Sequence, residues 1–208
     1  MNLWEIEQSY FDSGISLICG TDEAGAGPLA GPVYAAAVIL PPGWLPEGLN
    51  DSKQVSEKNR DRLYDEIIKY ATAWSVTSVD VAEIERVNIL NARLMAMEQA
   101  IMMLVPRPEF ALVDGNRDKG ITLPHLMVVK GDSHSASIAA ASILAKVSRD
   151  RYMTELDARY PQYGFAKHKG YGTAAHYAAL DAYGPCPVHR PSFLKKWNQK
   201  RTEGGGDA

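Results

Sequence analysis

The sequence predicts an α/β protein with a mixed β-sheet flanked by helices. Short apolar runs typical of strands alternate with longer segments whose apolar residues recur at helical spacing, as in a sheet covered by helices. The first two strand-like runs, 15–19 and 33–40, are joined by a segment rich in glycine and proline, which predicts a hairpin of adjacent strands. Strands that alternate with helices indicate α/β architecture, and the opening hairpin makes the sheet mixed.

Helices are predicted where a capping residue precedes a stripe of apolar residues at helical spacing. Ser56, Asp80 and Asn88 are suitable N-caps, and Pro106 ends the third of these helices. Strands are predicted where short apolar or alternating runs lie between turn signals. In chain order, the elements beside the hairpin are a short docking helix in 1–14, helices 56–71, 80–86 and 88–105, strands 72–79, 109–113 and 126–129, and helices 133–153 and 173–182.

The composition is that of a soluble globular protein of one domain. The 208 residues are 46% apolar and 23% charged, no apolar run reaches membrane-spanning length, and the N-terminus does not resemble a secretory signal. Cys19 and Cys186 lie far apart, so we expect no disulfide and a cytoplasmic location. The net charge of −3 does not indicate nucleic-acid binding, although local basic clusters matter more than the total. We expect a monomer.

Four acidic residues follow strand-like runs and are candidates for a metal site. Asp22 and Glu23 come after the first run, and Asp114 and Asp132 follow two later runs. Neighbouring side chains of a regular strand point to opposite faces, so Asp22 and Glu23 converge only near a strand end. Clustered carboxylates suit a hard divalent cation, Mg²⁺ or Mn²⁺, and two such cations activate a water and stabilise the leaving oxygen of a phosphodiester. A polar strand end followed by a turn is the alternative interpretation.

The segment 161–173 is predicted to be an irregular loop that meets a nucleic acid. It interleaves basic with aromatic residues, which suits contact with a phosphate backbone and with sugar faces. A solvated turn is the alternative. The residues concerned are Lys167, His168 and Lys169, together with Tyr163, Phe165 and Tyr171.

Several short motifs occur in order between residues 15 and 193. They are Asp22–Val33 (DEAGAGPLAGPV), Asp51–Lys53, Asp114–Asn116, Lys130–Ser133, Ala139–Val147, Tyr163–Phe165, Lys167–Thr173 and His189–Phe193. In order and spacing they resemble ribonuclease HII. An N-terminal extension of the ribonuclease HIII kind is absent, which favours HII within the group.

The resemblance implies a ribonuclease H-like mixed β-sheet flanked by helices, with a helical C-terminal extension. The catalytic domain would span 1–160, and a helical region at 161–200 would cover the substrate. The glycine run near the end of the chain separately predicts a disordered tail at 201–208. The implied activity is cleavage of the RNA strand of RNA–DNA hybrids and incision 5′ to single ribonucleotides embedded in duplex DNA. The products would carry 3′-hydroxyl and 5′-phosphate ends.

The resemblance also implies roles for individual residues. Tyr171 would stack against the sugar at the RNA-to-DNA junction. The catalytic and metal-binding residues would be Asp22, Glu23, Asp114 and Asp132, and the phosphate contacts would come from Lys53, Lys146 and Lys169.

One position departs from that family. The family's loop reads Gly-Arg-Gly, whereas this chain has Gly25-Ala26-Gly27. In the family this loop senses the 2′-hydroxyl largely through its backbone, and the arginine side chain meets a phosphate. The two glycines keep the close backbone approach, but Ala26 removes a charge-assisted contact commonly worth about 1.5–3 kcal/mol. We therefore expect the fold and metal binding to survive and substrate affinity or junction positioning to weaken.

Two other classes of protein are open alternatives. The first is a catalytically impaired, nucleic-acid-binding relative of the same fold, although a pure binder has little need for four clustered carboxylates. The second is a different nuclease or recombinase on this fold. Such a protein would share the acids but neither the glycine loop nor the run 169–173.

Overall fold

The chain folds around a five-stranded sheet with the strand order β3-β2-β1-β4-β5. The structure is a computed structural model that describes residues 2–50, 52 and 55–204. β1 (Ile18–Ala24) lies at the centre, antiparallel to β2 (Val33–Ile39) and parallel to β4 (Phe110–Asp114). β3 (Ala73–Val79) pairs antiparallel with β2, and β5 (His125–Val128) pairs parallel with β4. The predicted mixed sheet and its opening hairpin are confirmed.

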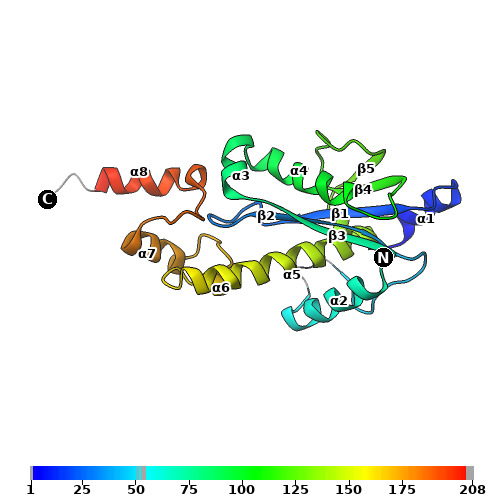
Figure 1. Ribbon diagram of the computed structural model, residues 1–208, viewed down its shortest axis with the longest axis horizontal. Coiled ribbons are helices and arrows are strands. Elements are labelled where there is room, and N and C mark those ends of the chain that lie inside the picture. The colour runs from blue at the N-terminus through cyan, green and yellow to red at the C-terminus, as the bar shows by residue number, and fades with distance from the viewer. Residues whose placement is uncertain (1, 51, 53–54, 205–208) are drawn as a thin grey trace.

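Helices cover both faces of this sheet (Figure 1). α5 (Ala136–Arg159) crosses β1 and β2 on one face with α2 (Glu57–Tyr70) beside it, while α3 (Val81–Val87) and α4 (Ile89–Met102) cover the other face. Separate clusters of buried apolar side chains fill the two interfaces. The close approach of α5 to β1 requires Gly20, because a Cβ atom there would lie 2.2 Å from the main chain of α5.

Side chains cap four helix starts, and three of these caps, Ser56, Asp80 and Asn88, are the ones that the sequence predicts. Ser56 caps α2, Asp80 caps α3 and Thr173 caps α7 (Ala174–Tyr183), each through a side-chain oxygen that accepts from a main-chain N–H in the first turn. Asn88 accepts from two main-chain nitrogens in the first turn of α4. Local capping chemistry thus determines where these helices begin.

α1 (Glu5–Asp12) is a short helix that docks onto the start of α5. Glu7 is completely buried, and its Oε1 accepts from Ser135 Oγ at 2.7 Å, Ser137 N at 3.0 Å and Ser137 Oγ at 2.9 Å. A carboxylate is favoured at this position because the first turn of a helix presents unpaired N–H groups. The predicted docking helix is therefore confirmed, and a buried carboxylate anchors it.

The start of α5 differs from the prediction. This helix begins after Ser135, its N-cap, rather than at Ser133, because the preceding residues form a separate 3₁₀ turn, η1 (Gly131–Ser133). It also continues to Arg159, past the predicted end at residue 153. The long helix therefore reaches from the acidic strand ends into the C-terminal region.

Two further predictions about the C-terminal region were wrong. α6 (Phe165–His168) is a short helix inside the predicted irregular loop 161–173. α8 (Lys195–Gly204) includes residues 201–204, which the sequence assigns to a disordered tail. The rest of that tail, 205–208, lies outside the described residues.

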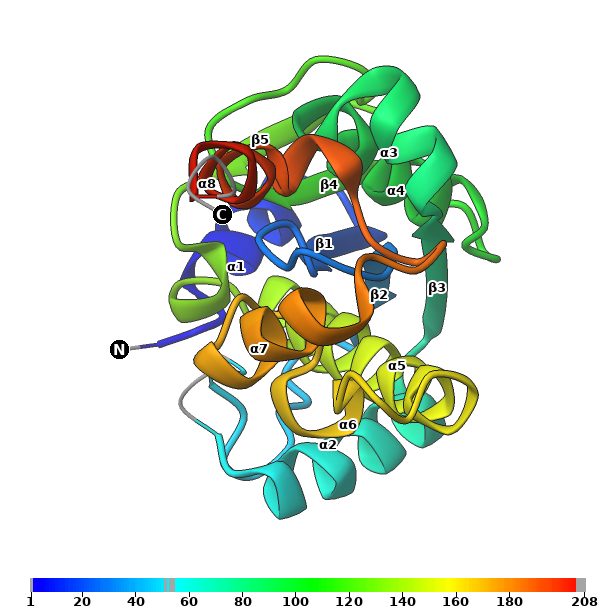
Figure 2. The ribbon, with the colours of Figure 1, turned by 90° about the vertical axis from the view of Figure 1, so that its left-hand side faces the viewer.

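The C-terminal region packs at the end of the sheet where β1 and β2 are connected (Figures 1 and 2). A third apolar cluster joins the end of α5 to α6, to α7 and to Leu29 and Ala30 in the β1–β2 connection. The chain then continues through η2 (Pro191–Phe193) into α8. Over the described residues, none of the helices combines the length and the apolar character needed to span a bilayer.

Candidate active site

Three of the four predicted acids meet at the end of the central strand pair. Asp22 and Glu23 lie on β1, and Asp114 is the last residue of β4. One carboxylate oxygen from each lies within 4.8 Å of the others. The pairing of β1 with β4 ends at Thr21 and Val113, so side chains from either face of β1 can turn into the space beyond. This geometry explains how two consecutive residues join one cluster.

The fourth predicted acid, Asp132, lies outside this group of three among the described residues. It is 6% exposed and belongs to η1, the turn that follows β5. That turn contacts the cluster through its main chain, because Gly131 N donates to Asp114 Oδ1 at 2.7 Å. The role of Asp132 as a metal ligand therefore stays a prediction.

Burial and like charge determine the electrostatics of the cluster. Burial, followed by repulsion from Glu23 and Asp114, raises the pKa of Asp22 well above its usual range. Burial also raises the pKa of Glu23, and the nearby Arg93 opposes this effect. Three carboxylates held so closely require a cation if they are to be ionised together.

The donor set fits a hard divalent cation. The three clustered side chains are carboxylates, whose oxygens are the ligands that Mg²⁺ and Mn²⁺ prefer. Glu23 Oε2 is buried and has no hydrogen-bond partner within the described part of the chain. A buried acceptor of this kind calls for a ligand, and a bound cation would satisfy it.

Two residues outside the predicted set of site residues support the acids. Arg93, on α4, forms an ion pair with Glu23 in which Nη1 lies 3.0 Å from Oε1. Ser142, on α5, lowers the pKa of Asp22 through a side-chain hydrogen bond, and its Oγ lies 2.8 Å from Ser52 Oγ. No pattern in the sequence signals the contact of Arg93, which lies 70 positions from Glu23.

A cleft of about 240 Å³ opens beside the acids. Asp22 and Glu23 line it together with the glycine loop, Lys146 and Tyr171. The structure thus brings predicted metal ligands and predicted substrate contacts to one concave surface.

The glycine loop is held from the interior of the protein. Gly25 has a φ of +97°, and a Cβ atom there would lie 2.0 Å from Arg149 Nε, so glycine is required. The buried guanidinium groups of Arg149 and Arg190 donate to main-chain carbonyls of the β1–β2 connection. The loop is therefore braced on one side while its residues line the cleft on the other.

Tyr171 faces this loop across the cleft. Its side chain is 47% exposed, and a Cβ atom at Gly27 would lie 3.8 Å from Tyr171 Cε1. A sugar bound in the cleft would meet both the loop and the tyrosine ring.

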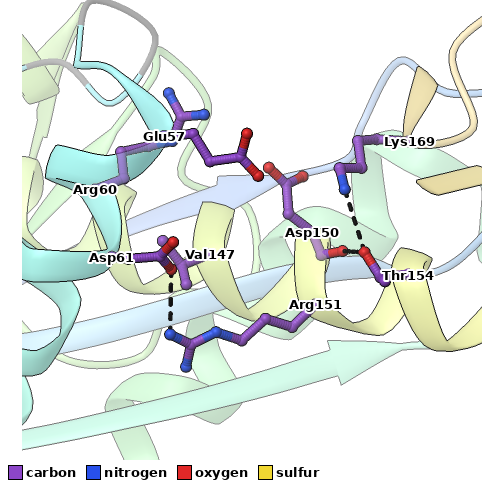
Figure 3. A pocket seen from close by; sticks show the side chains of 8 residues that line it. All are labelled: Glu57, Arg60, Asp61, Val147, Asp150, Arg151, Thr154 and Lys169. Atoms are coloured by element: carbon purple, nitrogen blue, oxygen red, sulfur yellow. Dashed lines mark hydrogen bonds and ion pairs between the residues drawn. The ribbon is translucent and has the colours of Figure 1, made fainter. Parts of the chain in front are cut away.

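The three predicted phosphate-binding lysines lie in different surroundings. Lys146 lines the cleft, and its Nζ lies 2.7 Å from Asp150 Oδ1. Lys169 points instead into a neighbouring pocket of about 260 Å³ between α2 and α5, where its Nζ donates to Thr154 Oγ1 at 3.3 Å (Figure 3). Lys53 lies outside the described residues.

Known proteins of one family resemble this chain over most of its length. The family described as Ribonuclease HII matches residues 19–196. A ribonuclease HII of Dechloromonas aromatica (strain RCB) is 58% identical over 179 residues, covering 86% of this chain and 91% of that protein. The ribonuclease H2 of Pyrococcus horikoshii OT3 has a TM-score of 0.73 at 23% identity, covering 90% of this chain and 100% of that one. Bst-RNase HIII in complex with Mn²⁺ has a TM-score of 0.64 at 20% identity, covering 81% of this chain and 63% of that one.

A helix-flanked mixed sheet with carboxylates at the ends of its central strands is the ribonuclease H-like architecture, and the structural likeness confirms that fold. The sequence match is closer still: the chain belongs to the ribonuclease HII family. Members of that family are hydrolytic endonucleases that act on RNA–DNA hybrids. The resemblance stated from the motifs is confirmed.

Proposed function

We propose that this protein is a metal-dependent endoribonuclease that cleaves the RNA strand of RNA–DNA hybrids and also incises duplex DNA on the 5′ side of single ribonucleotides. The main support is the convergence of Asp22, Glu23 and Asp114 within 4.8 Å, beside a cleft lined by the glycine loop and Tyr171. The products carry 3′-hydroxyl and 5′-phosphate ends, because water attacks phosphorus and the 3′ oxygen leaves.

The acids have the role of holding the metal. Bound Mg²⁺ or Mn²⁺ supplies an activated water and stabilises the leaving oxygen. Among structural relatives, a ribonuclease HIII is known in complex with Mn²⁺. We assign the ligand role to Asp22, Glu23 and Asp114, and to Asp132 if η1 turns its carboxylate toward the ion.

The walls of the cleft have the role of recognising the substrate. The main chain of Gly25-Ala26-Gly27 contacts the ribose 2′-hydroxyl, and Tyr171 stacks on the next sugar. Lys146 is placed to contact a phosphate near the cleft, whereas Lys53 and Lys169 are assigned to phosphates farther along the strand. The C-terminal region 161–200 covers the bound duplex.

The oligomeric state and the cellular location of the protein are part of the proposal. The protein is proposed to act as a monomer. Cys19 and Cys186 are free thiols, which suits the reducing cytoplasm.

The test is incision of a labelled DNA duplex that contains one ribonucleotide, with Mg²⁺, by the protein and by its Asp114→Asn variant. Metal-dependent incision on the 5′ side of the ribonucleotide, lost in the variant, supports the enzyme and the acid cluster together. Binding without incision, with activity gained on Ala26→Arg, would favour the impaired relative. Absence of incision even then would overturn the proposal.

A further inference from the structure

Two consecutive residues of the C-terminal region, His189 and Arg190, contact the β1–β2 connection, and His189 also contacts His176, which holds Tyr171 on the other side of the cleft. Arg190 N donates to Leu29 O at 2.8 Å, and His189 forms an antiparallel bridge with Ala30. Consecutive side chains of such an extended segment point to opposite sides. The side chain of Arg190 reaches the glycine loop, and the side chain of His189 points toward His176 and Tyr171.

Arg190 is fully buried behind the glycine loop. Its Nη2 donates to Gly25 O and to Gly31 O, both at 2.7 Å, and its Nη1 donates to Ala26 O at 3.2 Å. In a trans peptide the C=O and the following N–H point in opposite directions. Because two loop carbonyls turn toward the guanidinium, the N–H groups of Ala26 and Gly27 turn away from it. Both of these residues line the cleft.

His189 reaches Tyr171 through a second histidine. Cys186 N donates to His189 Nδ1 at 2.9 Å, which leaves the proton on Nε2. That nitrogen donates to His176 Nε2 at 3.0 Å, and His176 Nδ1 in turn donates to Tyr171 O at 2.9 Å. Each ring therefore donates once and accepts once in its neutral form. Burial, together with the nearby His176, lowers the pKa of His189 to about 4, which keeps the His189 ring neutral near pH 7.

We propose that His189 and Arg190 are positioning residues that set the glycine loop against Tyr171, and thereby set the affinity for the junction between a ribonucleotide and DNA. The inference rests on the proposed function, in which these two loops recognise the substrate. Neither side chain lines the cleft, so each acts through the loop that it holds. Leu29 N also donates to Gly170 O at 2.8 Å, which joins the two loops directly.

Arg190→Lys tests the hydrogen bonds from the Arg190 side chain to the glycine loop. Lysine keeps the buried charge but cannot serve three carbonyls with one planar fork. We expect KM for a duplex with one ribonucleotide to rise about tenfold, with kcat changed less than about threefold. Arg86→Gln is the matched control, because it removes a surface arginine that pairs with Glu83 on α3. The control should leave both constants unchanged.

His189→Phe and His189→Gln test the contact chain from His189 to Tyr171. Phenylalanine preserves ring packing against Tyr163 and Phe165 but removes both nitrogens, whereas the glutamine amide can still donate to His176 Nε2. We expect KM to rise in the phenylalanine variant and to return to within about threefold of the parent in the glutamine variant. A merely structural role would produce no such rescue.

Three further measurements separate positioning from other effects. They are the melting temperature, the Mn²⁺ affinity by calorimetry, and the Kd for the ribonucleotide duplex against an all-DNA duplex. We expect Arg190→Lys and His189→Phe to lose preference for the ribonucleotide duplex, while their Mn²⁺ affinity stays within about twofold of the parent's. Lower stability with KM and Kd unchanged, or a loss confined to kcat, would overturn the inference.

The parent protein shows which proposal has failed. If it incises the duplex and the variants behave like the control, positioning fails and the function stands. If it binds the ribonucleotide duplex preferentially without incising it, the proposed activity fails. The positioning role is then tested by the Kd values of the variants only. If it neither incises nor prefers that duplex, both proposals are overturned.

Discussion

Arg93 Nη1 lies 3.0 Å from Glu23 Oε1, and this ion pair joins α4 to the end of β1 at the acid cluster. The two side chains are 18% and 10% exposed. The guanidinium offsets one of the three negative charges of Asp22, Glu23 and Asp114, and it opposes the rise in the pKa of Glu23 that burial causes. Arg93 therefore stabilises the buried carboxylate of Glu23 in the metal-free protein.

Arg93→Gln should destabilise the metal-free protein by about 2 kcal/mol, less than the roughly 3–5 kcal/mol for breaking a fully buried pair. The physical reason is that Glu23 stays buried without its cation. Urea denaturation with EDTA measures the change, and saturating Mg²⁺ should reduce it because the metal supplies the missing charge. Arg62→Gln is the control, since Arg62 pairs with Glu66 on the exposed face of α2 and the expected cost is about 0.5 kcal/mol. Equal losses in the two variants would contradict this account.

Asp22→Asn should raise the melting temperature of the metal-free protein, by about 2–4 °C for each kcal/mol gained. The folded-state pKa of Asp22 is raised, chiefly by burial, so its ionised form opposes folding. This penalty is absent below the unfolded pKa near 3.8, grows as the pH rises toward the folded pKa, and is complete above it. The advantage of the variant should therefore shrink as the pH falls from 7 toward 4.

The same variant should lose the stabilisation that Mg²⁺ or Mn²⁺ gives the parent. A ligand that binds the folded state stabilises it by mass action, so the parent's melting temperature should rise with metal concentration. A variant that still gains as much stability from metal as the parent would show that Asp22 is no part of the metal site. A variant that melts lower than the parent in EDTA would contradict the burial penalty on Asp22.

Much of the fold could be predicted because its determinants are local. The N-caps Ser56, Asp80 and Asn88 lie next to the helices that they start, and short apolar runs mark the strands. The convergence of Asp22 with Asp114 was also predictable, since each comes directly after the last paired residue of two neighbouring strands.

What could not be predicted depends on contacts distant in sequence or on turn geometry. Arg93 reaches Glu23 across 70 positions, and no local pattern signals that contact. Asp132 lies outside the group of three acids among the described residues, and the 3₁₀ turn η1 that contains it contacts Asp114 through the main-chain N–H of Gly131. Lys169 adopts a left-handed conformation with φ of +51°, and its side chain enters the neighbouring pocket.

Ala26→Arg should increase kcat/KM on the single-ribonucleotide duplex by about tenfold or more, as expected for a charge-assisted contact of about 1.5–3 kcal/mol. Ala26 lines the cleft beside Gly25 and Gly27, so an arginine there would reach a bound phosphate. Mg²⁺ affinity should not change. Steady-state incision measures the gain, and Ala26→Gln controls for side-chain size without charge. An equal gain from glutamine would show that charge is not the missing element.

Glu7→Ala should destabilise the protein by about 2–3 kcal/mol while leaving incision unchanged at temperatures where the variant is folded. Removing the carboxylate leaves the buried donors of Ser135 and Ser137 without their acceptor at the start of α5. For a chain of 208 residues this loss corresponds to a drop of about 4–12 °C in melting temperature. Glu5→Ala, an exposed position on the same helix, should change it little. If Glu7→Ala instead reduced kcat without loss of stability, α1 would have a role at the active site rather than in anchoring α5.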